Sequence, residues 1–69
     1  MNIMEKLRDI KVLAYPDNGY AVAEGESAEG MQFMKRQFDS LNTSFESDDI
    51  NIFLESLRNE GLTFSFRGG

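Results

Sequence analysis

The sequence predicts an α+β fold: a small, mostly antiparallel sheet, made of a β-hairpin and a C-terminal strand, with two helices packed on one face. Three patterns predict it: a turn signal at Pro16–Gly19, two stretches of helical periodicity, and a final stretch of alternating apolar and polar residues. At 69 residues the chain is near the lower limit for a single apolar core. We therefore expect residues 1–69 to form one small domain.

The hairpin is expected to join a strand at Ile10–Tyr15 to a returning strand at Tyr20–Glu24. In its turn, proline presets φ, the Asp and Asn side chains bond nearby backbone, and glycine accepts a positive φ. Leu13 and Tyr15 indicate that the second face of the first strand is at least partly covered. Before the hairpin, residues 2–8 are expected to form either a short helix that begins with a capping box or an irregular segment that leads into the first strand.

The first helix is expected to begin at Ser27, which can act as its N-cap, with Glu29 in the first turn. Gly30 weakens that turn by about 1 kcal/mol relative to alanine. The residues from Asn42 to Glu46 form either a short strand or a loop that places Phe45 in the core. The predicted apolar stripe of this helix consists of Met31, Met34, Phe38 and Leu41.

The second helix is expected to begin with Ser47 as N-cap and to end before Gly61. Asp48 and Asp49 then place negative charge in its first turn, where the helix dipole favours it. The last strand follows, with Leu62, Phe64 and Phe66 on one face, and the helix is expected to cover these aromatic residues. The predicted stripe of the helix consists of Ile50, Phe53, Leu54 and Leu57.

The charge of the chain is strongly acidic. Twelve acids and seven bases give a formal net charge of −5, and no lysine or arginine occurs within residues 12–34 or 37–57. Such a field disfavours direct binding to nucleic acid and allows an acidic surface aimed at a basic partner. The alternative is that the acids only keep a small protein soluble.

The residue types limit the chemistry. The chain has no histidine and no cysteine, so Ser-His-Asp and Cys-His sites and thiolate or imidazole metal sites are excluded. Residues 25–30 do not fit a phosphate-binding loop, and the acids lack the spacing of a calcium loop. We expect no enzyme activity, no cofactor and no metal. No apolar run is long enough to span a bilayer and no secretory signal opens the chain, so we expect a cytoplasmic protein.

Several side chains are candidate partner contacts. Phe33 and Ile52 lie off the predicted helix stripes and could instead belong to the core, and Tyr15 and Tyr20 flank the hairpin turn as possible cross-strand neighbours. Two acidic clusters complete the set. The candidates are Tyr15, Tyr20, Glu24, Glu26, Glu29, Phe33, Glu46, Asp48, Asp49 and Ile52.

The expected function is therefore that of a non-catalytic module whose acidic surface binds a basic patch on a larger protein. In size and charge the chain is similar to inhibitors carried by phages and other mobile elements, some of which occupy the nucleic-acid groove of a host nuclease or CRISPR effector. A different alternative is a self-associating structural module, in which the last strand or the hairpin edge pairs in a homodimer.

The C-terminal residues Phe66-Arg67-Gly68-Gly69 resemble the tail of ubiquitin-like modifiers and sulfur carriers. The hairpin followed by a helix is also similar to the start of the β-grasp fold of that family, although a helix directly before the last strand departs from its usual pattern. The resemblance implies that the carboxylate of Gly69 is adenylated by an activating enzyme, with Arg67 and Gly68 as a flexible approach.

Overall fold

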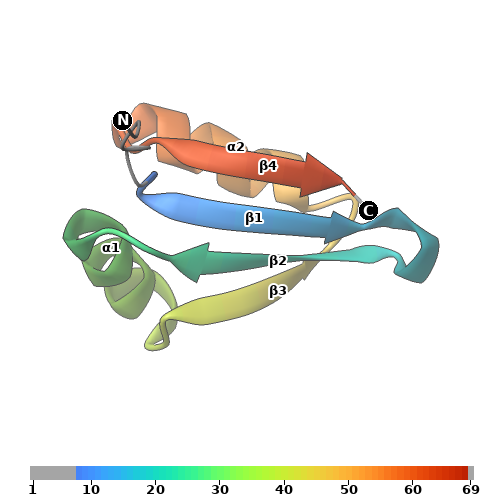
Figure 1. Ribbon diagram of the computed structural model, residues 1–69, viewed down its shortest axis with the longest axis horizontal. Coiled ribbons are helices and arrows are strands. Elements are labelled where there is room, and N and C mark those ends of the chain that lie inside the picture. Colours follow the sequence, from blue (N-terminus) through green and yellow to red (C-terminus); the bar gives the residue numbers. More distant parts are fainter. Residues whose placement is uncertain (1–7, 69) are drawn as a thin grey trace, which may run out of the picture.

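A computed structural model describes residues 8–68 and shows a four-stranded mixed sheet with two helices (Figure 1). The strand order is β3-β2-β1-β4; β2 pairs antiparallel with β1 and β3, and β4 pairs parallel with β1. The predicted α+β fold with a mostly antiparallel sheet is confirmed. The elements are β1 (Ile10–Tyr15), a 3₁₀ turn (Pro16–Asn18), β2 (Tyr20–Gly25), α1 (Ala28–Phe38), β3 (Asn42–Glu46), α2 (Ile50–Asn59) and β4 (Phe64–Gly68).

The predicted hairpin is confirmed, and β2 runs one residue further than expected, to Gly25. Tyr15 and Tyr20 are register partners on either side of the turn. Gly19 has φ of 81° and donates its N–H to the carbonyl oxygen of Tyr15 at 3.0 Å. The conformation of this glycine is the one that the turn signal required. The residues before Arg8, including most of the predicted N-terminal segment, lie outside the described residues.

The core lies on one face of the sheet and joins it to both helices. The centre of its aromatic part is Phe53, whose ring lies 4.6 Å from that of Phe45 and 6.0 Å from that of Phe38, centroid to centroid. Each member of the core is at most 6% exposed. The core residues are Ile10, Val12, Ala21 and Ala23 from the strands, and Phe33, Met34, Ile50, Phe53, Leu54 and Leu57 from the helices.

The N-cap of α1 is as predicted, but its buried stripe is rotated. The hydroxyl of Ser27 accepts the N–H of Gly30 at 2.9 Å. The buried residues of α1 are Gly30, Phe33 and Met34, whereas Met31 is 36% exposed. The rotation arises because Gly30, without a side chain, lies directly against the backbone of Asp9, and this contact fixes which face of the helix meets the sheet.

The residues from Asn42 to Glu46 form a strand, which settles the alternative left open by the sequence. In β3, Thr43 and Phe45 pair with Ala23 and Ala21 of β2. Phe45 is half-buried and packs against the core. The strand alternative is therefore confirmed and the loop alternative is wrong, although the strand also brings this ring to the core.

The stripe of α2 is buried as predicted, but the predicted start of the helix is wrong. Residues 47–49 form a turn, α2 begins at Ile50, and Asp49 occupies the N-cap position without a side-chain hydrogen bond. The N–H of Asp49 bonds to the carbonyl oxygen of Glu46 at 2.8 Å, so residues 46–49 close a turn before the helix, and the N–H of Ser47 bonds to the carbonyl oxygen of Gly19 at 2.9 Å, which holds this turn beside the hairpin. At the other end, Gly61 has φ of 76° and closes the helix as expected.

The last strand differs from the prediction in its start and in its burial. β4 begins at Phe64 instead of Leu62. Phe64 is half-buried beneath the guanidinium of Arg58, which lies 5.5 Å from the ring centroid. Phe66 is 48% exposed, so the prediction that the helix covers both aromatics is wrong for this residue. The cause is that β4 is an edge strand, with a neighbouring strand on one side only.

Candidate functional site

The structure distributes the sequence candidates over separate places instead of one site. Four groups result. Phe33 is 4% exposed and belongs to the core, so the core alternative holds for it. Glu24, Glu26 and Glu29 lie at one end of β2, and Glu46 lies at the other end, opposite Tyr20. The two acidic clusters are therefore separated by the length of a strand.

Acidic residues from two segments that are distant in sequence lie at the end of the sheet where the hairpin turns. The register pair of Tyr20 with Glu46, and the hydrogen bond from Ser47 to Gly19, hold the start of the β3–α2 connection beside the turn. Among the ion pairs of residues 8–68, none includes a carboxylate of this group. We call it the acidic tip, and its members are Asp17, Glu46, Asp48 and Asp49.

Sequence reasoning selected three members of the acidic tip and missed Asp17. This residue lies in the 3₁₀ turn, far from Glu46 in sequence, and only the pairing of β2 with β3 brings the two segments together. Its position inside a clear turn signal was the one available indication that it would be exposed at a hairpin end.

Ile52 lies on the outer side of α2, beside the acidic tip. It is 69% exposed, so the core alternative fails for this residue. Its N–H bonds to the carbonyl oxygen of Asp49 at 3.2 Å, which places it in the first turn of the helix, directly after Asp48 and Asp49. An exposed aliphatic side chain bordered by carboxylates is a suitable contact for a partner with a basic rim.

The face of the sheet turned away from the core forms a second candidate surface. We call it the open face; in the described part of the chain no helix packs on it, and in Figure 1 α2 lies behind β4 and β1. The rings of Tyr15 and Tyr20 lie on it with centroids 5.1 Å apart, and both are exposed. From β3 towards β4 its rows are Glu46, Tyr20 and Tyr15; Ser44, Val22, Leu13 and Arg67; Asn42, Glu24, Lys11 and Ser65.

The sequence predicted that the open face would be at least partly covered. Only neighbouring side chains of the sheet provide this cover in the described part of the chain. Leu13 and Val22 are half-buried, whereas Tyr15 and Tyr20 remain exposed. The acids at the end of β2 away from the hairpin turn are partly neutralised, because Nζ of Lys11 lies 3.8 Å from a carboxylate oxygen of Glu26. The acidic tip therefore carries the less compensated negative charge.

Asp9 is a half-buried residue that links three segments of the chain, and sequence reasoning did not identify it. Its carboxylate accepts the hydroxyl of Ser27 at 2.5 Å and the N–H of Thr63 at 2.9 Å. The Ser27 bond is the main reason that the pKa of Asp9 lies below its usual value, and the bonds from Thr63 add to it. The carboxylate thereby ties the start of β1 to the cap of α1 and to the approach of β4. This role is structural.

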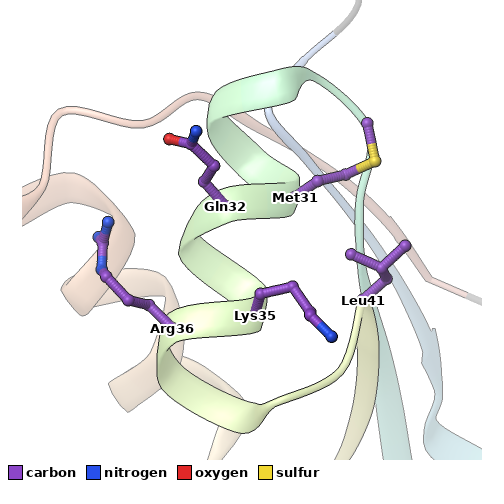
Figure 2. Close-up of a pocket in the computed structure, with 5 residues that line it drawn as sticks. All are labelled: Met31, Gln32, Lys35, Arg36 and Leu41. Carbon is purple, nitrogen blue, oxygen red and sulfur yellow. The ribbon is translucent and has the colours of Figure 1, made fainter.

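A shallow hollow of about 450 Å³ lies on the outer side of α1 (Figure 2). Met31 and Lys35 project towards Leu41 on one side of the helix, while Gln32 and Arg36 project to the other. Its lining includes no carboxylate, hydroxyl or thiol group, and Lys35 and Arg36 are its charged residues. The hollow therefore offers apolar contact and positive charge without a constellation for bond-breaking chemistry.

The C-terminal tail does not have the form that the ubiquitin-like resemblance implies. Arg67 and Gly68 belong to β4, with Gly68 in register with Ala14, so they are strand residues instead of a flexible approach. Gly69 lies outside the described residues.

Within residues 8–68, no three metal-ligating side chains come together, and no helix there is long and apolar enough to cross a membrane. Comparison with known proteins found no match among family models, curated proteins or solved structures.

Proposed function

We propose that this chain is a non-catalytic protein-binding module that docks its acidic tip, together with Ile52, on the basic patch of a larger protein. The observation that supports this most is the joint position of the tip and Ile52: the fold brings carboxylates from two segments to one end, beside an isoleucine that is 69% exposed. Charge complementarity would give speed and orientation to binding, and the isoleucine would give apolar contact.

In its more specific form, the proposal is that the module inhibits a nucleic-acid-binding protein. A groove built for a phosphate backbone is lined by lysine and arginine, and carboxylates can occupy the positions of the phosphates. The net charge of −5 supports this form, because it favours a basic target. A nuclease or CRISPR effector of the host is the class of target proposed.

The test uses two variants with the same change in net charge. The first replaces the tip acids, Glu46→Lys, Asp48→Lys and Asp49→Lys. The second replaces Glu24, Glu26 and Glu29 by lysine at the far end. Three acid-to-lysine changes add six charges, so each variant moves from −5 to +1. The immobilised full chain is exposed to a lysate of the source organism, and captured proteins are eluted with a salt gradient or with a DNA duplex.

We expect the parent and the far-end variant to capture the same protein and to release it to the duplex. The tip variant should lose at least 10-fold in affinity. Equal loss in both variants would show that only net charge matters, and unchanged capture by the tip variant would refute the proposed surface. Because lysine at the start of α2 opposes the helix dipole, thermal unfolding of both variants must confirm that they remain folded.

A further inference from the structure

The open face carries an apolar centre between sides of opposite charge. Leu13 and Val22 occupy its middle, and Tyr15 and Tyr20 extend the apolar area towards the hairpin turn. Lys11 on β1 and Glu24 on β2 are register partners at the other end of the same face. We propose that this face binds the same face of a second copy of the chain, around a two-fold axis parallel to the strands. The proposal does not rest on the function proposed above.

The strand order determines which strands meet across an axis that is parallel to the strands and passes between β1 and β2. A two-fold axis parallel to the strands preserves position along each strand and reverses the order across the sheet, so β1 of one copy faces β2 of the other. Val22 then faces Leu13 of the second copy, and Tyr20 faces Tyr15. Each contact occurs twice, as in any isologous interface.

The same axis also matches the charges. Glu24 of each copy faces Lys11 of the other, across sheets that pack about 10 Å apart. A two-fold axis in the same plane but perpendicular to the strands would set Lys11 against Tyr15 and leave the charges unmatched. Complementary charge therefore selects the second copy as the occupant and selects its orientation.

The size of the face predicts a weak, reversible dimer. Four strands span about 14 Å and five residues along a strand span about 16 Å. A face of this size buries less than the roughly 800 Å² per partner of a standard stable interface. The four apolar side chains nevertheless supply rigid contact area, and we expect half-association at a concentration on the order of 100 µM.

The first measurement is sedimentation equilibrium of the full chain from about 10 µM to about 1 mM at low salt, where weak charged contacts persist. The mean mass should rise towards that of two chains. Tyr20→Lys should remain monomeric, because it removes an apolar contact with Tyr15 of the second copy and places a charge in the interface. Met31→Lys is the matched control, since it adds the same charge at an exposed apolar position on α1, and it should associate as the parent does.

The second measurement tests the axis by mixing two charge variants. Lys11→Glu and Glu24→Lys each set like charges against each other in a homodimer, so each alone should associate at least 10-fold more weakly than the parent. In an equimolar mixture both contacts join opposite charges, and the mass should return to that of the parent. Mere net repulsion would instead make Glu24→Lys associate more strongly than the parent, because this variant is less acidic.

Circular dichroism verifies that each variant is folded. The proposal is overturned if the parent stays monomeric at about 1 mM, a concentration at which even weak interfaces associate. It is also overturned if Tyr20→Lys associates like the parent, or if the mixture is no heavier than its components.

Discussion

Replacing Gly30 by alanine should destabilise this protein, although helix propensity predicts the opposite. Gly30 occupies the first turn of α1, where alanine would be favoured by about 1 kcal/mol. A Cβ at this position would lie 2.6 Å from the carbonyl carbon of Asp9, and the carbonyl oxygen is closer still. The atoms in conflict are backbone atoms, so no side-chain rotation relieves them.

The size of the effect follows from what must move. Ordinary carbon contacts lie at about 3.5–4.0 Å, so β1 and α1 must separate by roughly 1 Å or more. That displacement strains the bond from the Glu26 N–H to the Asp9 carbonyl, now 2.9 Å, and the bond from Ser27 to the Asp9 carboxylate. Overpacking costs about 1–3 kcal/mol and each weakened hydrogen bond about 1 kcal/mol. After the gain in propensity of about 1 kcal/mol, we expect a net loss of about 2–4 kcal/mol.

Urea unfolding followed by circular dichroism measures this loss. The matched control is Gln32→Ala, an exposed position of the same helix, which should change stability by less than about 0.5 kcal/mol. A protein of this size has a total stability of only about 3–10 kcal/mol, so the expected shift in midpoint is large. A Gly30→Ala variant as stable as the parent, or more stable, would refute the close approach of α1 to β1.

Three further predictions concern stability. The pKa of Asp9 is lower in the folded state, so its contribution to the free energy of unfolding is present above the pKa of the unfolded state and disappears as pH falls through the folded pKa. Asp9→Asn should therefore lower the urea midpoint at pH 7 and have little effect near pH 2. Leu57→Ala removes a fully buried side chain and should cost about 3 kcal/mol in urea unfolding, whereas Ile52→Ala should cost less than about 0.5 kcal/mol; equal effects would contradict the assigned faces of α2. Gly61→Ala should cost about 1 kcal/mol of thermal stability, because alanine is strained at φ of 76°, and a neutral result would contradict the helix end described here.

The features predicted from sequence are those with local causes. The hairpin turn needs only four consecutive residues, the cap of α1 needs Ser27 and the amide of Gly30, and the buried stripe of α2 follows from its own period. Each of these is decided within one or two turns of the chain, so the local residues specify the structure.

The errors arise where a distant segment decides. Ser47 has the chemistry of an N-cap, but residues 46–49 close a turn beside the hairpin and the helix begins only at Ile50. The stripe of α1 is displaced because Asp9 meets Gly30, and the sequence shows only a glycine that weakens a helix. The same limit applies to the candidate surfaces, since the acidic tip and the rows of the open face exist only once strand order and register are known.

The parallel pairing of β1 with β4 has a consequence for how the chain acquires its structure. β1 is the first strand to be synthesised and β4 the last, yet Ile10 and Val12 gain their second neighbours only from Phe64 and Phe66. Until residues 64–68 emerge, a nascent chain can form the hairpin but exposes a hydrophobic strand edge beside it. Closing so long a loop is slow, so we expect the pairing of β4 with β1 to form late in folding.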